Sequence, residues 1–272
     1  MAQFSGAWPA LVTPFTEAGE VNAPVLRRLL DYLIDRGIGG FYVNGSTGEG
    51  IYMTVAQRKL ALETAVDKVA GRVPVIAHVG AVATPDATEL AAHAQQAGAD
   101  GVASILPPLY AHPDSLFDYY ASLSKAAPDI PLFTYIFGGG LDAVALMQKL
   151  MAIDTVAGSK YTGPNMYEFR QIVELRNDDG WTIFSGMDEQ CLFAAMFGAS
   201  GNIGTTLNYI PSVYREIHAA VGRGDMAEGV RLQLRANEIT RILFNYGFPG
   251  ALKEVMGMLG FDCGQPRLPN RL

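Results

Sequence analysis

The chain has 272 residues, of which 49% are hydrophobic and 17% charged, and its formal net charge is −7 at pH 7. This length and apolar content suit a compact α/β protein with a full core and exclude a disordered chain. The negative charge, spread without long runs of one sign, gives no electrostatic footprint for nucleic acid or an anionic membrane surface.

Cysteine content and the N-terminal residues indicate the compartment. Cys191 and Cys263 are too few for a disulfide framework and form no CxxC pair, which favours a reducing cytoplasm. The first residues lack the basic and apolar regions of a signal peptide. No apolar run approaches the roughly 18 residues of a membrane helix. We therefore expect a cytoplasmic protein.

Short apolar runs alternate along the chain with amphipathic segments that open on capping residues, such as the capping box of Thr54 and Gln57. The expected strands are 7–12, 41–43, 73–78, 101–106, 131–135, 155–160, 181–185 and 201–205. The expected helices are 22–37, 54–71, 84–98, 113–126, 142–151, 164–176, 188–197 and 211–221. Eight successive strand–helix units predict a closed (β/α)8 TIM barrel of the α/β class rather than an open doubly wound sheet. A Rossmann domain is also disfavoured because no GxGxxG follows the first strand.

Residues 225–259 predict two or three further helices, broken at Gly247-Phe-Pro-Gly250. A C-terminal helical extension of this kind packs against the barrel or against a partner subunit. No linker composition interrupts the chain. We therefore expect a single domain over 1–272, with the barrel at 1–222 and the extension at 223–272.

Lys160 is the most informative candidate for chemistry. The other five lysines fall in amphipathic helices, whereas Lys160 closes an apolar strand at the end where TIM barrels carry their active sites. Burial disfavours a charged amine, so an unpaired lysine at this place favours a neutral nucleophile. The alternative is an ordinary strand-end lysine that reaches water or forms an ion pair.

Two other strand ends carry polar candidates. Ser46 and Thr47, in the glycine-rich loop after the second strand, offer hydroxyl and backbone N–H groups for a carboxylate. A phosphate cradle or a plain turn remains open, and Glu49 is expected to orient this loop. Tyr135 ends the fifth strand and is either a proton relay or a core tyrosine. Together with Lys160, these groups suit an amine that condenses with a 2-oxo acid and uses the iminium as an electron sink.

The chain resembles the dihydrodipicolinate synthase and N-acetylneuraminate lyase family of class I, pyruvate-dependent aldolases, from Gly6 to about Pro269. The resemblance rests on the order Gly-Ser-Thr-Gly-Glu after strand two, Tyr at the end of strand five and Gly-x-Lys at the end of strand six. It implies that Lys160 forms the imine, Tyr135 shuttles a proton, and Ser46 with Thr47 binds the pyruvate carboxylate. It implies no cofactor beyond the covalent imine.

Further stretches are similar to the lyase branch of the family. They are Gly158-Ser-Lys-Tyr-Thr162, Met166-Tyr-Glu168, Gly186-Met-Asp-Glu-Gln190, Gly198 to Thr206, Asn208-Tyr209 and Pro266 to Pro269. The resemblance implies that hydroxyls of the acceptor chain are bound by Thr162, Asp188, Glu189 and Thr205. Asp188 could instead, or also, be the N-cap of the helix that follows it. The implied reaction is cleavage of a 2-oxo-3-deoxy sugar acid such as N-acetylneuraminate to pyruvate and an aldehyde.

The chain also departs from the family pattern. Where the family has Tyr-Asn-x-Pro, this chain has Tyr135-Ile-Phe-Gly138 followed by two more glycines. The synthases carry an arginine shortly after this tyrosine, but none lies between Tyr135 and Lys160. Dihydrodipicolinate synthesis, or another pyruvate-dependent reaction of the family, is therefore the second choice. Tyr110 occupies the place of a family tyrosine that crosses into a neighbouring subunit's proton relay.

Two other classes of function fit the sequence less well. A metal-dependent aldolase needs clustered ligands, but the histidines 78, 93, 112 and 218 have no ligand spacing and only His78 lies near a strand end. A non-catalytic 2-oxo-acid sensor would not need both Lys160 and Tyr135. The expected partner is a small 2-oxo acid, with no nucleic acid or membrane, and the resemblance implies a homotetramer. The acceptor and the favoured direction stay open.

Overall fold

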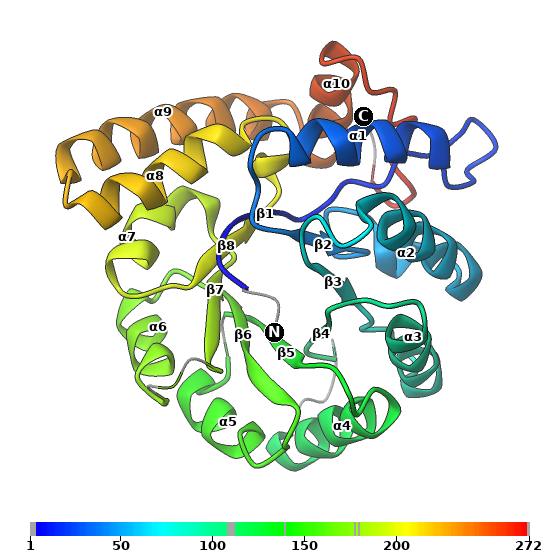
Figure 1. The fold of residues 1–272 in the computed structure, drawn as a ribbon, viewed down its shortest axis with the longest axis vertical. Coiled ribbons are helices and arrows are strands. Elements are labelled where there is room, and N and C mark those ends of the chain that lie inside the picture. Colours follow the sequence, from blue (N-terminus) through cyan, green and yellow to red (C-terminus); the bar gives the residue numbers. More distant parts are fainter. Residues whose placement is uncertain (1–3, 108–111, 139, 177, 179, 271–272) are drawn as a thin grey trace.

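The computed structural model describes residues 4–107, 112–138, 140–176, 178 and 180–270. Eight strands form one parallel sheet, in the order β1-β8-β7-β6-β5-β4-β3-β2 (Figure 1). The strands are β1 (Gly6–Pro9), β2 (Phe41–Val43), β3 (Val75–His78), β4 (Gly101–Ile105), β5 (Leu132–Phe137), β6 (Val156–Thr162), β7 (Thr182–Ser185) and β8 (Gly201–Gly204). The last and first strands in this order, β2 and β1, are joined by a parallel bridge between Ala10 and Tyr42, so the predicted TIM barrel is confirmed.

Helices connect successive strands and form the outer layer of the barrel (Figure 1). They are α1 (Ala23–Ile34), α2 (Val55–Val69), α3 (Thr84–Gln96), α4 (Pro113–Ala126), α5 (Ala143–Leu150), α6 (Met166–Val173), α7 (Cys191–Met196) and α8 (Pro211–Arg223). Their starts follow local chemistry: Thr54 and Gln57 form a complete capping box at α2, and the Asn22 side chain accepts a hydrogen bond at the start of α1.

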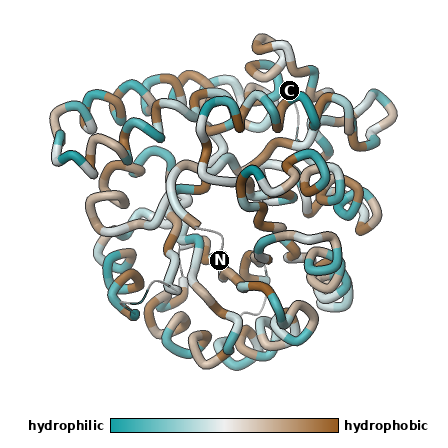
Figure 2. Tube along the Cα trace, viewed as in Figure 1, coloured by the Kyte–Doolittle hydropathy of each residue, from teal (hydrophilic) through white to brown (hydrophobic). Residues whose placement is uncertain are grey.

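Two layers of apolar side chains stabilise the barrel. Inside it, alternate strand residues pack together, including Trp8, Phe133 and Phe184, and Trp8 meets Phe184 edge to face with ring centroids 5.2 Å apart. A larger core lies between strands and helices and contains the leucines of α1. Figure 2 shows the corresponding pattern, with hydrophobic strands and helices that turn hydrophilic residues outward.

The C-terminal extension consists of α9 (Met226–Asn245) and α10 (Phe248–Met258). Helix α9 lies beside α8 and also contacts α7, while α10 packs against α9 (Figure 1). The chain breaks between them at Gly247, whose φ of 84° is in the left-handed region. None of the helices in the described part of the chain has the length and apolarity needed to cross a membrane.

Several element boundaries differ from the expected ones. Strands β5 and β6 each run two residues further, to Phe137 and Thr162, because these residues continue the pairing between the two strands. Lys160 therefore lies within β6 rather than at its last residue. Strand β1 ends at Pro9, and Ala10 continues the pairing only as a single bridge to Tyr42. The expected helix at 164–176 covers only Met166–Val173.

Candidate active site

The amine of Lys160 lies inside the barrel between two aromatic rings. Its side chain comes from β6 and the residue is only 6% exposed. The Nζ atom is 4.2 Å from the centroid of the Tyr135 ring and 5.0 Å from that of Tyr42. None of the ion pairs among the described residues involves Lys160. The faces of the two rings, which attract positive charge, therefore suit a cationic nitrogen at this place.

All eight described residues singled out from the sequence for catalysis or substrate binding line one cavity of about 330 Å³. They are Ser46, Thr47, Tyr135, Lys160, Thr162, Asp188, Glu189 and Thr205. They come from β2, β5, β6, β7 and β8 or from the residues just after these strands, where parallel barrels gather functional groups. Tyr110, the proposed subunit-crossing residue, lies outside the described residues.

The loop after β2 brings the hydroxyls of Ser46 and Thr47 to the mouth of the barrel. Left-handed backbone at Asn44 (φ 63°) and Glu49 (φ 57°) folds this loop tightly. Thr47 Oγ1 lies 2.6 Å from Thr205 Oγ1, which follows β8. The hydrogen bond between these two hydroxyls ties the ends of β2 and β8 together, while Ser46 is exposed in the cavity.

Asp188 is buried, and only one oxygen of its carboxylate accepts hydrogen bonds from the described residues. Oδ2 accepts hydrogen bonds from the backbone N–H of Thr206 (2.9 Å) and from its hydroxyl (2.7 Å). Burial raises the pKa of Asp188 to about 6, and the two bonds from Thr206 act in the opposite direction. The expected alternative role as a helix N-cap is wrong: a 3-10 turn, Asp188–Gln190, precedes α7, and the carboxylate is engaged by Thr206 instead.

Close packing at Gly186 shapes the wall between Lys160 and Thr162. A Cβ added to Gly186 would lie 1.8 Å from Thr162 Oγ1 and 2.8 Å from Lys160 Cε, so only glycine leaves both side chains in place. Thr162 Oγ1 itself is buried and has no hydrogen-bond partner among the described residues. A buried hydroxyl without a partner that lines a cavity is suited to bind a ligand.

The departure from the family pattern after Tyr135 gives the cavity an aromatic edge. Phe137, the last residue of β5, lines the cavity and is 61% exposed. The next residue, Gly138, donates its N–H to the Thr162 carbonyl at 2.7 Å. At the opposite edge, Phe244 and Phe248 stack with centroids 4.8 Å apart. The mouth therefore combines polar groups with an aromatic rim.

Sequence reasoning missed the contribution of the extension to this cavity. Thr240 and Phe244 of α9 and Phe248 of α10 line it. Helix α9 also holds the turn of the acid pair: Gln233 Nε2 donates to the Asp188 carbonyl at 3.0 Å, and Asn237 Nδ2 donates to the Glu189 carbonyl at 3.2 Å. The sequence does hold a sign of this contribution. Gln233 and Thr240 are polar residues seven positions apart and therefore lie on one face of the helix.

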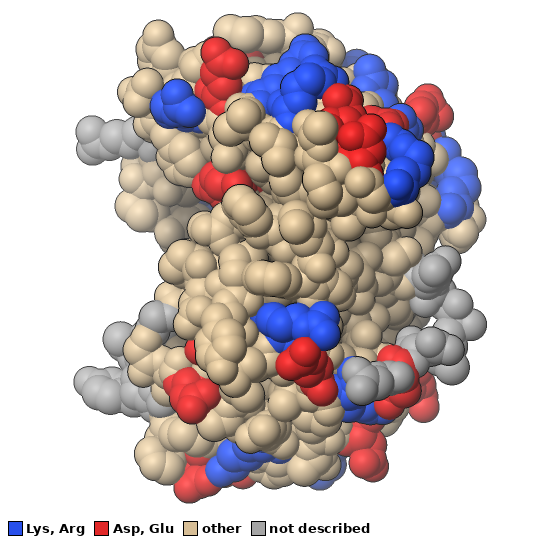
Figure 3. Space-filling view, turned by 90° about the vertical axis from the view of Figure 1, so that its left-hand side faces the viewer, with Lys and Arg blue, Asp and Glu red and all other residues tan. Residues whose placement is uncertain are grey.

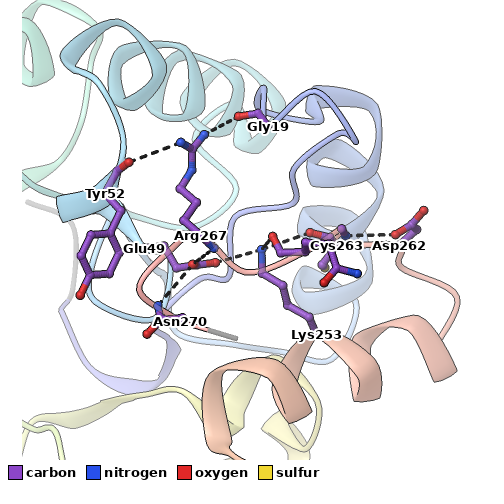
Figure 4. Close-up of polar contacts among 10 residues, drawn as sticks. Gly19, Glu49, Tyr52, Lys253, Asp262, Cys263, Arg267 and Asn270 are labelled. Atoms are coloured by element: carbon purple, nitrogen blue, oxygen red, sulfur yellow. Dashed lines mark hydrogen bonds and ion pairs between the residues drawn. The ribbon is translucent and has the colours of Figure 1, made fainter. Parts of the chain in front are cut away.

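A second buried lysine joins the loop after β2 to the C-terminal tail. Lys253 was expected on an ordinary amphipathic helix, but it is only 4% exposed and its Nζ lies 2.9 Å from Glu49 Oε1 (Figure 4). Burial lowers the pKa of Lys253 and the contact with Glu49 opposes this. The other Glu49 oxygen accepts the backbone N–H of Arg267 at 2.6 Å. Glu49 thus orients its loop by binding the tail.

His78, the histidine nearest to the site, is engaged through both ring nitrogens. Nδ1 lies 3.2 Å from the carbonyl of Asn44, and Nε2 accepts the backbone N–H of Ile105 at 3.1 Å. Burial lowers the pKa of His78 well below its usual range, so the ring is neutral. In the described part of the chain, no group of three or more His, Cys, Asp or Glu side chains is placed to hold a metal ion.

Comparisons with known proteins show which family and which solved structures the chain is similar to. The model of the dihydrodipicolinate synthetase family matches residues 3–271. N-acetylneuraminate lyase of Mus musculus is 32% identical over 275 residues, which cover 97% of this chain and 86% of the relative. The structure of Proteus mirabilis N-acetylneuraminate lyase matches with a TM-score of 0.94 at 32% identity, over 99% of this chain and 93% of that one. Dihydrodipicolinate synthase from Aquifex aeolicus matches with a TM-score of 0.89 at 30% identity, over 98% and 92%.

Proposed function

Because the chain belongs to the dihydrodipicolinate synthetase family, whose lyases act through a Schiff-base lysine, we propose that it cleaves a 2-oxo-3-deoxy sugar acid such as N-acetylneuraminate to pyruvate and an aldehyde. The chain is a pyruvate-dependent class I aldolase at the level of its family. What carries the proposal for the sugar acid is the single cavity that joins the Lys160 amine to an acid pair and a set of hydroxyls.

In the proposed first step, the 2-oxo acid enters with its carboxylate on Ser46 and Thr47. The Lys160 amine attacks C2, and loss of water from the carbinolamine leaves an iminium between the nitrogen and C2. The positive charge of this iminium falls between the rings of Tyr135 and Tyr42, at the distances given above, where both ring faces stabilise it.

In the proposed second step, the Tyr135 hydroxyl relays the proton that leaves the C4 hydroxyl. The C3–C4 bond breaks, its electron pair moves into the iminium to form an enamine, and C4 becomes the carbonyl of the departing aldehyde. A proton then returns to C3, and water hydrolyses the imine to release pyruvate and the free Lys160 amine. The buried position of Tyr135, beside Lys160 in the same cavity, supports this role.

The acceptor half of the substrate lies against Asp188, Glu189, Thr162 and Thr205 in this proposal. A polyhydroxylated chain needs donors and acceptors at fixed positions, and carboxylates accept several such hydrogen bonds. No arginine is among the described residues that line the cavity, so a second substrate carboxylate meets no guanidinium among them. This favours the sugar acid over the dihydrodipicolinate synthase reaction.

Imine formation is tested by incubating the protein with pyruvate, reducing with borohydride and measuring the protein mass. We expect an adduct that maps to Lys160 and is absent in Lys160→Ala. A wild-type mass that stays unchanged would contradict the proposed chemistry.

The substrate is tested separately, by pyruvate release from a panel of 2-oxo-3-deoxy sugar acids set beside condensation of pyruvate with aspartate semialdehyde. We expect release from N-acetylneuraminate or a related sugar acid. If only the semialdehyde reaction proceeds, the synthase alternative is correct.

We further propose that the chain forms a homotetramer. The side of the molecule shown in Figure 3 carries charged side chains above and below a broad band without them. Large apolar side chains are exposed on α7 and α9, among them Phe193, Met196 and Leu234, and such surfaces favour burial between subunits. Light scattering coupled to size exclusion tests this, and a monomer mass at micromolar concentration would exclude the tetramer.

A further inference from the structure

The two carboxylate oxygens of Asp188 have different surroundings. Oδ2 receives both hydrogen bonds from Thr206. Oδ1 is buried and has no partner among the described residues, although Asp188 lines the cavity. Oδ1 lies against Gly204, where an added Cβ would come within 1.5 Å of it. An ionised carboxylate oxygen in such a place is costly unless a ligand supplies the missing donor.

The Thr206 hydroxyl also contacts a second side chain, that of Tyr214. It lies 2.7 Å from Asp188 Oδ2 and 2.6 Å from the hydroxyl of Tyr214 on α8. Threonine has one hydroxyl proton and an ionised carboxylate only accepts, so Thr206 donates to Asp188 and accepts the proton of Tyr214. Burial raises the pKa of Tyr214, which keeps the phenol protonated as a donor. A chain of directed hydrogen bonds thus runs from α8 to the cavity.

We propose that Thr206 and Tyr214 are positioning residues that occupy Oδ2 of Asp188 and leave Oδ1 as the oxygen that accepts a hydroxyl of the acceptor half of the substrate. This inference rests on the proposed function, because it concerns the half of the substrate that departs as the aldehyde. Neither residue is assigned a contact with the reacting carbon atoms. Their effect passes through the orientation and charge of Asp188.

Few of the titratable neighbours of Asp188 carry a charge that can change its pKa. Titratable groups face it from several elements: Glu189 in the same turn, Lys160 on β6, Cys191 on α7, Tyr209 after η3 (Thr206–Asn208) and Tyr214 on α8. Burial raises the pKa of Cys191, Tyr209 and Tyr214, so these three remain neutral. Glu189 opposes ionisation of Asp188, and Lys160 and Thr206 favour it.

The test compares Thr206→Val, Thr206→Ser and Tyr214→Phe in the full-length protein, with N-acetylneuraminate as the substrate. For Thr206→Val we expect KM to rise by roughly tenfold, as for loss of a hydrogen bond to a charged group. We expect the acid limb of the kcat/KM profile to follow the raised pKa of Asp188 in the wild type and to move to higher pH in Thr206→Val. In Tyr214→Phe we expect KM and the acid limb to change in the same direction as in Thr206→Val, but by a smaller factor. In Thr206→Ser we expect wild-type KM and pH profile, because serine keeps the hydroxyl.

Controls separate this inference from the proposed function and from unfolding. Thr64→Val removes a hydroxyl that donates to the Leu60 carbonyl within α2, and we expect KM and pH profile to stay as in the wild type. Trapping of pyruvate on Lys160 is expected to be equal in all variants, since the proposal assigns Asp188 to the acceptor half of the substrate and not to pyruvate. If the wild type cleaves the substrate and both Thr206→Val and Tyr214→Phe keep its KM and pH profile, the inference is wrong. If the wild type traps no pyruvate, the proposed function itself fails.

If circular dichroism shows that Thr206→Val does not fold, the inference is tested with Tyr214→Phe and Thr206→Ser instead. An altered KM and pH profile in Tyr214→Phe, together with wild-type values in Thr206→Ser, supports the inference. Wild-type values in Tyr214→Phe overturn it.

Discussion

The Nζ atom of Lys160 lies 4.2 Å from the centroid of the Tyr135 ring, and the two residues are partners in the register of β5 and β6. The same ring that faces the amine carries the hydroxyl proposed to move a proton. Its two parts, the π face and the phenolic O–H, can therefore be separated by a substitution that keeps one and removes the other.

Tyr135→Phe keeps the ring face and removes the hydroxyl. We expect trapping of pyruvate on Lys160 to persist and carbon–carbon cleavage to fall by about 10²–10⁴-fold, the usual contribution of a positioned acid–base group. Mass measurement after borohydride reduction and a pyruvate-release assay report the two steps. Tyr161→Phe is the matched control, because its hydroxyl binds Glu168 outside the cavity. Cleavage by Tyr135→Phe within tenfold of the wild-type rate would remove Tyr135 from the mechanism.

Gly186→Ala is expected to abolish most activity without unfolding the protein. The new methyl group would overlap Thr162 Oγ1 and approach Lys160 Cε, and displacement of reacting groups by about 1 Å costs roughly 10²-fold in rate. Gly222→Ala in α8 meets nothing within 4 Å and is expected to be fully active and slightly more stable, because alanine favours the helix. Equal activity of the two variants would contradict this account of the site.

Asp188→Asn is expected to stabilise the fold at alkaline pH. The folded-state pKa of Asp188 is about 6, above the ordinary value of 3.8. Between these values the folded state binds more protons than the unfolded state, so the free energy of unfolding falls as pH rises through this window, by about 3 kcal/mol in total. Asparagine does not titrate and avoids this loss.

Urea unfolding at pH 8 and at pH 4 checks the prediction. The variant should exceed the wild type at pH 8 by about 2–3 kcal/mol, and the difference should vanish near pH 4. Asp118→Asn, on the exposed side of α4, controls for loss of a negative charge and should give no such pH dependence. A variant that is less stable than the wild type at pH 8 would show that ionised Asp188 is better solvated than its burial implies.

Removing one partner of the Glu49–Lys253 pair is expected to be costly. Both side chains are buried, so Lys253→Met leaves an unpaired carboxylate and should lower the free energy of unfolding by about 3–5 kcal/mol. The double variant Glu49→Gln with Lys253→Met leaves no unpaired charge and should recover much of this loss. Double-mutant analysis of urea unfolding measures the coupling.

Lys59→Met provides the exposed counterpart, because Lys59 pairs with Glu89 on the surface. Its cost should not exceed about 1 kcal/mol. A similar cost for Lys253→Met would mean that the buried pair does not secure the tail (Figure 4).

The sequence by itself determined the architecture. The alternation of apolar strands with capped helices is a local property, and eight repeats of it leave few ways to bury the apolar faces other than a closed barrel. The rule that strand ends gather at one mouth then brought Ser46, Tyr135 and Lys160 together, and the structure places all three around one cavity. The roles assigned to them stay predictions until the trapping and substitution experiments are done.

The tertiary structure decided what holds these groups and how they are charged. Gln233 reaches the Asp188 turn across 45 positions of sequence, and Glu49 meets Arg267 across 218. Such contacts arise from how α9 and the tail pack on the barrel, and no local pattern encodes them. For the same reason the sequence predicted an ordinary helix lysine at Lys253 and left an N-cap role open for Asp188. Burial and partners, which set the cost of a charge, exist only once distant segments have come together.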